Sequence, residues 1–156
     1  MTALNLFHFL YNLTYFFLAA QGVFYLLCFS RVFGDSSPAD FIRMRQKAAP
    51  ILEPRLSLLY YSCLITGAVT VVLSCTESWS TRAIFTLISY LLLLTDVVLA
   101  KRFNIPVNSV IETVNADTIG SFEAAAIQGT WLKWITVRGR IMIAGFTLLL
   151  MKFLFI

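Results

Sequence analysis

Charged residues are scarce in this sequence. Asp, Glu, Lys and Arg make up 13% of the 156 residues, whereas 59% are hydrophobic and 14 are Phe. A soluble globular domain carries about 25% charged residues and needs far less apolar surface for its core. The composition therefore excludes an ordinary soluble domain and indicates an integral membrane protein.

Residues that bind metals and haem are scarce too. His8 is the only histidine, and bis-histidine haem ligation needs two. Asp96 is the only carboxylate inside the long apolar runs, so a zinc or di-iron site lacks ligands. Three cysteines without paired spacing favour apolar packing over a disulfide framework. We expect no metal and no cofactor, and the sequence shows neither a phosphate-binding glycine loop nor a nucleophile elbow.

Four long apolar runs are present, at about residues 4–30, 56–75, 83–100 and 131–156. Roughly 20 residues in a helix cross the ~30 Å hydrocarbon layer. Lipid admits only helices and closed barrels, and these runs are too long and too uniformly apolar for barrel strands. The first run has neither the basic start nor the cleavage site of a signal peptide. The sequence predicts an all-α membrane protein, with residues 1–156 forming one four-transmembrane-helix bundle.

Basic residues gather in the connections on one side of these runs. They are Arg31, Arg43, Arg45, Lys47 and Arg55 after the first run, and Lys101, Arg102 and Lys133 around the third and fourth. The positive-inside rule places these connections in the cytoplasm and both termini outside a cytoplasmic (inner) membrane. This asymmetry and attraction to anionic lipid account for the net charge of +4, so we expect lipid but no nucleic acid as a partner.

The connections contain helix signals of their own. Ser37, Pro38 and Asp40 are typical of a helix start, and the amphipathic segment that follows predicts a cytoplasmic interfacial helix that ends before Pro50. Its role is to anchor the chain at the lipid surface or to dock a partner. Further along, Ser121 is a candidate N-cap for a helix that runs into the last span.

Asp96 is the most informative polar residue, because an ionisable group inside a span normally faces the protein interior and has a partner. Asp96 and Arg138 each lie five residues inward from a basic boundary residue, which is roughly 7.5 Å at 1.5 Å per residue. The same count places Tyr25 and Tyr60 in nearly the same layer. We therefore predict a polar cluster of these four residues.

Trp131 and Trp134 precede Arg138 by seven and four residues, so one helix face carries all three and permits cation–π packing. Two interpretations of this polar layer stay open. It is either a structural ion pair that fixes helix register or a small pocket that contains an acid, a base and phenols.

One longer pattern resembles a known family. A span followed by Phe103-Asn104-Ile105-Pro106-Val107-Asn108, a connection of some 25 residues, and Trp131 with Arg138 seven residues later is similar to anthrone oxygenase-like proteins. These are small four-helix membrane proteins, mostly of unknown function. The resemblance implies cofactor-free oxidation of an anthrone, a fused-ring phenol, to a quinone, with Asn108, Trp131 and Arg138 at the site. Ile135 stands where the family often has a histidine.

Two functional hypotheses follow. In the first, the protein binds or oxidises a hydrophobic aromatic molecule, with Asp96, Arg138 and Asn108 as catalytic candidates. Its ligand-binding candidates are Tyr25, Tyr60, Trp131 and Trp134. In the second, the protein is a non-catalytic packing or accessory subunit of a membrane complex or a homo-oligomer. An open cavity favours the first hypothesis, and a closed bundle with Asp96 fully paired favours the second.

Overall fold

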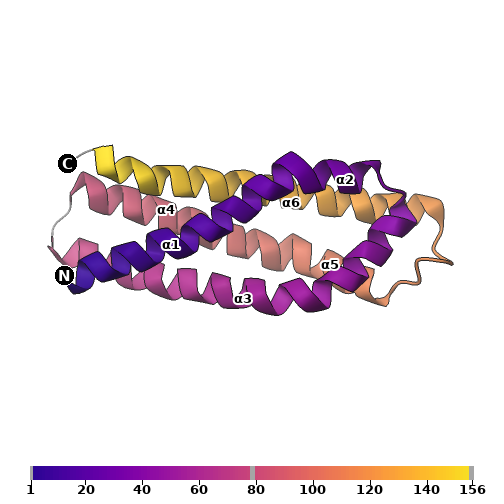
Figure 1. Ribbon diagram of the computed structural model, residues 1–156, viewed down its shortest axis with the longest axis horizontal. Helices are drawn as coiled ribbons and strands as arrows, with labels where there is room; N and C mark the ends of the chain where they lie inside the picture. Colours follow the sequence, from indigo (N-terminus) through magenta and orange to yellow (C-terminus); the bar gives the residue numbers. More distant parts are fainter. Residues whose placement is uncertain (1, 78–79, 155–156) are drawn as a thin grey trace.

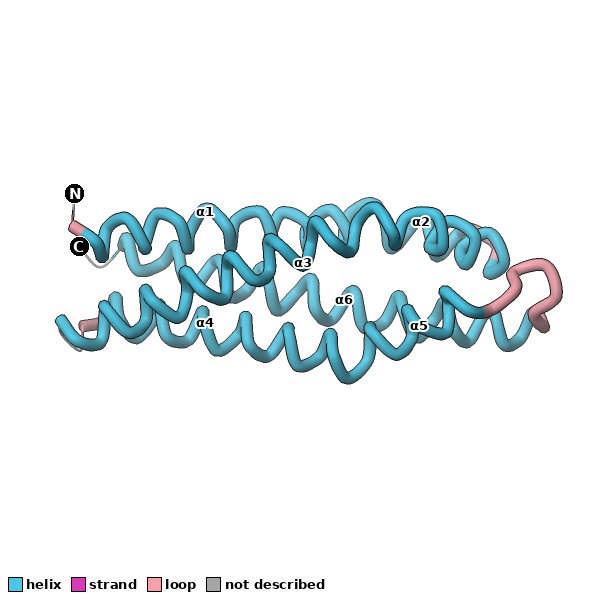
Figure 2. The backbone as a smooth tube through the Cα atoms, turned by 90° about the horizontal axis from the view of Figure 1, so that it is seen from below, coloured by secondary structure: helices cyan, strands magenta, loops and turns pink. Residues whose placement is uncertain are grey.

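The computed structural model describes residues 2–77 and 80–154, and these residues form helices and short connections without any β-strand. The helices make four long rods that lie side by side (Figures 1 and 2). The first rod joins α1 (Ala3–Phe24), the π-helix η1 (Tyr25–Phe29) and α2 (Ser30–Asp35), and the second is α3 (Pro38–Glu77). The third joins α4 (Thr81–Leu99), the π-helix η2 (Ala100–Asn104) and α5 (Ile105–Thr113), and the fourth joins α6 (Ser121–Met151) and the 3₁₀ turn η3 (Lys152–Leu154).

Four of the described helical stretches are long and apolar enough to cross a membrane. They contain 33, 39, 33 and 34 residues. Large apolar side chains such as Leu27, Leu58 and Ile65 are exposed on their outer faces, as expected for helices whose surroundings are lipid. The prediction of an all-α bundle with four apolar helices is confirmed. Both chain ends lie at the same end of the bundle (Figure 1).

The second rod differs from the prediction, because α3 does not end before Pro50. It runs for 40 residues with Pro50 and Pro54 inside it. Each proline removes one backbone N–H donor, which bends a helix but does not oblige it to stop. Figure 1 shows the first turns of α3 running steeply across the end of the bundle and the rest running along it. The prediction of a separate interfacial helix was therefore wrong.

The beginning of α3 is nevertheless where the sequence places it. The Asp40 backbone N–H donates to Ser37 Oγ at 3.2 Å, as the capping pattern predicts. This segment packs inward, since Phe41 and Ile42 are fully buried against Phe33 and Trp131 in one hydrophobic cluster. Phe41, which the sequence pattern places on a lipid-facing stripe, instead holds α3 against the core, whereas Met44 on the same stripe is exposed.

The fourth rod runs into the last span as predicted, but the predicted N-cap is wrong by one residue. Gly120 occupies the cap position, Ser121 is the first residue of α6, and the helix continues through Gly129 into the apolar run. At the same end of the bundle, two glutamines cap helix C-termini of neighbouring rods. Gln46 Nε2 donates to the carbonyl oxygens of Ile111 and Val114 at 2.7 and 2.8 Å, and Gln128 donates to those of Phe33 and Ser36. These contacts fix the connections around the region described next.

Candidate functional site

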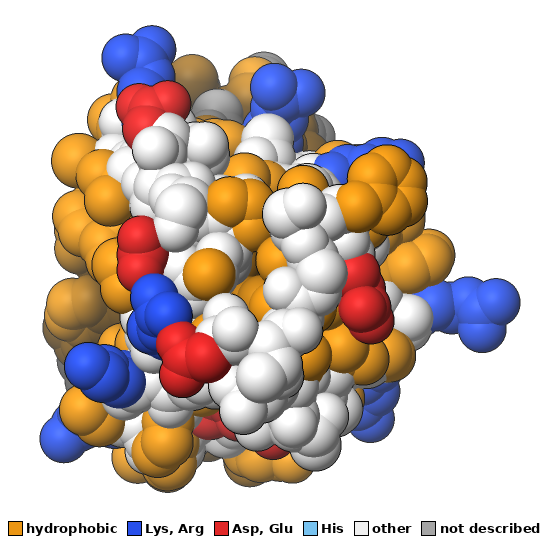
Figure 3. Space-filling model, turned by 90° about the vertical axis from the view of Figure 1, so that its right-hand side faces the viewer, with side chains coloured by type: hydrophobic (Ala, Val, Ile, Leu, Met, Phe, Trp, Pro, Cys, Tyr) orange, Lys and Arg blue, Asp and Glu red, His pale blue; other side chains and the backbone are white. Residues whose placement is uncertain are grey.

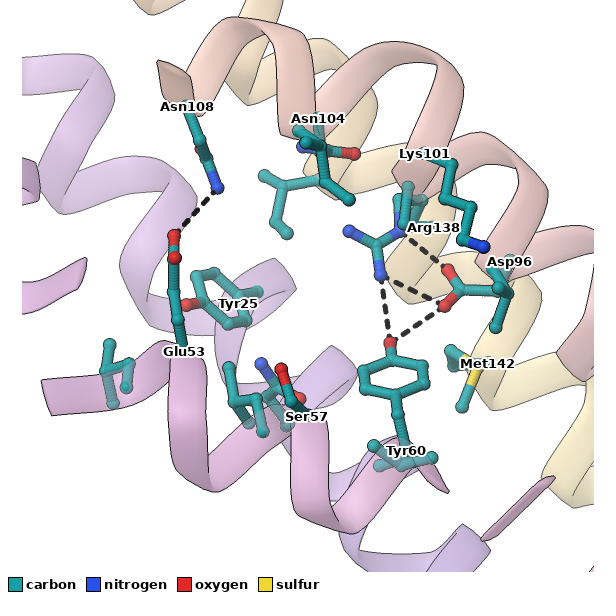
Figure 4. A pocket seen from close by; sticks show the side chains of 18 of the residues that line it. Tyr25, Glu53, Ser57, Tyr60, Asp96, Lys101, Asn104, Asn108, Arg138 and Met142 are labelled. Carbon is teal, nitrogen blue, oxygen red and sulfur yellow. Dashed lines mark hydrogen bonds and ion pairs between the residues drawn. The ribbon is translucent and has the colours of Figure 1, made fainter. Parts of the chain in front are cut away.

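The predicted partners Asp96 and Arg138 form a buried ion pair. Arg138 Nε donates to Asp96 Oδ1 at 2.8 Å, and Arg138 Nη2 donates to Oδ2 at 3.0 Å. The Tyr60 hydroxyl donates to Oδ2 at 2.8 Å and accepts from Arg138 Nη2 at 2.9 Å. Asp96 is fully buried, and Figure 4 shows the three side chains converging from α4, α6 and α3. The carboxylate is thus held by a two-pronged guanidinium and by a phenol.

Tyr25 lies at the predicted depth but outside this hydrogen-bonded group. Its ring packs edge-on against Trp131, with the ring centroids 6.0 Å apart. Figure 4 shows its hydroxyl pointing toward the Glu53 side, away from Arg138. Counting residues predicts depth along a helix, but the direction of a side chain around the helix decides its partners. The predicted cluster of four residues is therefore a cluster of three.

The predicted cation–π contacts also differ. The Arg138 guanidinium lies over the Tyr60 ring, 6.0 Å from its centroid, rather than over a tryptophan. Trp134 stacks on Phe103 at 3.6 Å and does not line the cavity described below. The reason is competition: the carboxylate of Asp96 holds the guanidinium toward α4, and a charged hydrogen bond is stronger than a cation–π contact. Trp134 is accordingly not a ligand-binding residue of this cavity.

A second polar group lies around Asn108, toward the end of the bundle that holds the long connections. Trp131 Nε1–H donates to Asn108 Oδ1 at 3.1 Å, and Asn108 Nδ2 donates to Glu53 Oε1 at 3.2 Å. The Arg45 guanidinium lies over the Trp131 ring, 4.8 Å from its centroid. The resemblance placed Asn108 and Trp131 together, and the structure shows that they are directly bonded. Arg45 and Glu53 join them from α3.

A cavity of about 460 Å³ connects the two polar groups. Such a volume falls within the roughly 300–1,000 Å³ of small-molecule sites. Figure 4 shows Asn108 and Glu53 on one side and the Asp96 group on the other, with Tyr25, Asn104 and Ser57 between them. The exposed lining residues are on α3 and on the third rod, so the cavity opens between these two rods; they are Ser57, Tyr61, Lys101, Ile105, Ser109 and Glu112.

Both π-helices lie at the level of this cavity. Tyr25 begins η1, and Asn104 ends η2. A π-turn inserts one extra residue into a helix and is often found at functional sites. Asn104 is 4% exposed, lines the cavity, and its Oδ1 has no hydrogen-bond partner among the described residues. The two asparagines, Asn104 and Asn108, are four residues apart and share one face of the third rod.

Sequence reasoning missed three residues of this site: Arg45, Glu53 and Asn104. Arg45 was counted only as one of the basic residues that set orientation. Glu53 lies between two prolines in a segment predicted to be non-helical. The spacing of Asn104 from Asn108 was a usable signal, because both amides fall within the one family-like motif of the chain.

Comparison with protein-family models, with curated proteins and with solved structures gives no match for this chain. The resemblance to anthrone oxygenase-like proteins therefore stays a hypothesis that depends on the motif residues alone. What the site does must be argued from its geometry.

Proposed function

We propose that this protein binds a flat hydrophobic molecule that carries a phenol or quinone oxygen. The observation that carries the proposal is the cavity with the Asn104 amide in its wall. A buried polar group without a hydrogen bond is destabilising by about 1–3 kcal/mol, so most such groups in folded proteins have partners. A ligand hydroxyl can donate to the unpaired Asn104 Oδ1, and a quinone carbonyl can accept from the Nδ2–H of the same amide. The rings of Tyr25, Tyr60 and Trp131 suit an aromatic body.

The group of Asp96, Arg138 and Tyr60 supports the competing hypothesis of a structural ion pair that fixes helix register, because Asp96 is fully buried and fully paired. The two interpretations are compatible, since the paired group forms one wall of the cavity. These hydrogen bonds fix the register of α3, α4 and α6 and so give the cavity its shape. The hypothesis of a packing or accessory subunit differs in predicting no specific ligand.

The resemblance to anthrone oxygenase-like proteins adds a reaction to the proposal. In this reaction, O₂ oxidises the methylene group of an anthrone to a carbonyl, and the second oxygen atom leaves as water. The methylene proton must first go to a base. Glu53 accepts one hydrogen bond, from Asn108, whereas Asp96 accepts three. Of the two carboxylates, Glu53 is the better acceptor for that proton, and Asn108 orients it.

We place the protein in a cytoplasmic membrane with both termini outside. The end that holds the long connections carries acidic and basic side chains over its surface (Figure 3), including the exposed ion pairs of Arg43 with Asp40 and Asp117. An end of this kind suits contact with headgroups and water. The cavity then lies toward the cytoplasmic leaflet.

Tryptophan fluorescence tests the binding proposal. The chain has three tryptophans, so the double variant Trp79→Phe, Trp134→Phe leaves Trp131 as the only one. The matched variant Trp79→Phe, Trp131→Phe leaves Trp134. We expect anthraquinone to quench Trp131 saturably and Trp134 only weakly, because Trp131 lines the cavity and Trp134 does not. Equal, unsaturable quenching of both would contradict a specific site and favour the packing subunit.

A further inference from the structure

Arg45 is a buried cation that forms no salt bridge within the described part of the chain. Its side chain lines the cavity and the residue is only 6% exposed. Among residues 2–77 and 80–154, no carboxylate lies within the 4.0 Å of a salt bridge to Arg45. Within the same residues its one hydrogen bond runs from Nη2 to Asn108 Oδ1 at 3.5 Å, the outer limit of such a bond, and its buried Nε has no partner. Burying a charge in this way is unfavourable unless the charge is paired.

The other charged groups of the cavity do not supply that pair. Arg138 and Asp96 neutralise each other. Glu53 is the nearest candidate by chemistry, but its Oε1 accepts from the amide of Asn108 at 3.2 Å. Asn108 thus stands between the guanidinium and the carboxylate and bonds to both. Glu112, a further carboxylate of the cavity lining, attracts Arg45 from a distance as Glu53 does, but within the described residues neither carboxylate forms a salt bridge with it.

The contact of Arg45 with Trp131 determines which part of the guanidinium can bind a ligand. The guanidinium carbon lies over the Trp131 ring, 4.8 Å from its centroid, so the ring covers one side of the group, while the N–H donors lie in the plane of the guanidinium. Those donors match the two oxygens of a carboxylate or phosphate, which a planar arginine fork binds in a bidentate manner. Trp131 is itself fixed by its bond to Asn108, so the fork is preorganised.

We propose that Arg45 binds an anionic oxygen group, a carboxylate or a phosphate, on the molecule that the cavity holds. This inference deepens the proposed function and rests on it: the acid group lies at Arg45, and the apolar body extends past Tyr25 and Asn104 toward the Asp96 group. The anion has two possible sources, a free aromatic acid or the headgroup of an anionic lipid that enters between α3 and the third rod.

Calorimetric titration with two matched probes tests the first source. Anthraquinone carboxylate and its methyl ester share the ring system and differ in charge. We expect the wild-type protein in neutral detergent to bind the carboxylate at least roughly tenfold more tightly than the ester, since a hydrogen bond to a charged group is stronger than one to a neutral group. Arg45→Gln should remove this preference, and Arg45→Lys, which keeps the charge without the fork, should retain part of it.

Arg55→Gln is the control, because Arg55 is an exposed cation on the same helix that does not line the cavity. It should leave the preference unchanged. Elution volume and melting temperature in detergent verify that each variant folds, and if Arg45→Gln does not fold, the comparison of wild type with Arg45→Lys decides. A preference that survives Arg45→Gln overturns the anion site while leaving the proposed aromatic site standing. Equal binding of both probes to the wild type excludes an aromatic acid as the source of the anion, and the lipid test then decides.

The lipid source is tested separately in nanodiscs of phosphatidylcholine with or without phosphatidic acid. If neither aromatic probe binds, the proposed function fails, but retention of phosphatidic acid by the wild type and not by Arg45→Gln in native mass spectrometry still supports the anion site. Loss of phosphatidic acid from both proteins, together with no carboxylate preference, overturns it.

Discussion

At the scale of single residues, the ion pair of Asp96 and Arg138 is buried, whereas the other two ion pairs among the described residues are exposed. Neutral hydrogen bonds between membrane helices contribute about 0.6 kcal/mol on average. Leaving one member of a buried ion pair without its partner is destabilising on the order of 3 kcal/mol or more. Arg138 has Asp96 as its only carboxylate partner within the described residues, so the loss of Asp96 leaves a buried charge unpaired and the larger of these two values applies.

We therefore predict that Asp96→Asn lowers stability by on the order of 3 kcal/mol, measured by unfolding in mixed micelles. The double variant Asp96→Asn, Arg138→Gln should regain part of the loss, because it leaves no unpaired charge. Asp40→Asn removes an exposed carboxylate on the surface and should change little. Unchanged stability of Asp96→Asn combined with lost anthraquinone binding would instead identify Asp96 as a ligand-binding group.

At the scale of helices, packing depends on small residues that let α1 and α6 approach closely. A Cβ atom added at Gly22 would lie 3.1 Å from the Gly139 carbonyl oxygen. At Gly145 the added atom would overlap the Tyr15 hydroxyl oxygen. Tyr15 is fully buried and donates to the Ser89 carbonyl oxygen at 3.3 Å, so its hydroxyl cannot easily move.

Gly145→Ala should accordingly destabilise the bundle by about 1–3 kcal/mol, the usual range for overpacking. Adding Tyr15→Phe removes the clashing oxygen and should restore part of the stability. Gly129→Ala lies in the same helix, where the added Cβ meets nothing within 4 Å, and should be neutral or stabilising by up to about 1 kcal/mol. A loss of similar size in both alanine variants would show that the contact with Tyr15 is not the cause, because alanine has the higher helix propensity at both positions.

The helices also show which features of the fold can be predicted from the sequence. Four apolar rods and the depth of Asp96, Tyr60 and Arg138 follow from run length and a constant rise per residue, so both were predictable. The direction of a side chain was not, because it depends on helix rotation and on π-turns that leave no simple signal. For this reason Tyr25 was wrongly placed in the hydrogen-bonded cluster, although it lines the cavity, and Trp134 was wrongly placed at the cavity. The prediction of a helix end at Pro50 was wrong. Contacts between the buried face of α3 and the rest of the bundle keep this helix continuous, and local sequence rules do not include such contacts.

For the whole molecule, the two ends of the bundle differ in chemistry. At the end with the termini, the buried Lys152 ammonium contacts His8 Nδ1 at 3.0 Å and donates to Asn12 Oδ1 at 3.3 Å, which ties the fourth rod to the first. The opposite end has the long connections, the cavity and most of the exposed basic residues. Orientation in the membrane therefore decides from which leaflet a ligand reaches the cavity.

Cysteine labelling tests that orientation. In a background with Cys28, Cys63 and Cys75 replaced by alanine, Thr2→Cys and Thr118→Cys place single thiols at exposed positions at opposite ends. We predict that a membrane-impermeant maleimide labels Thr2→Cys in intact spheroplasts and Thr118→Cys only after permeabilisation, because basic connections stay in the cytoplasm. The reverse pattern would place the cavity in the outer leaflet. Arg45 would then meet anions there, instead of the acids and anionic lipids of the cytoplasmic side.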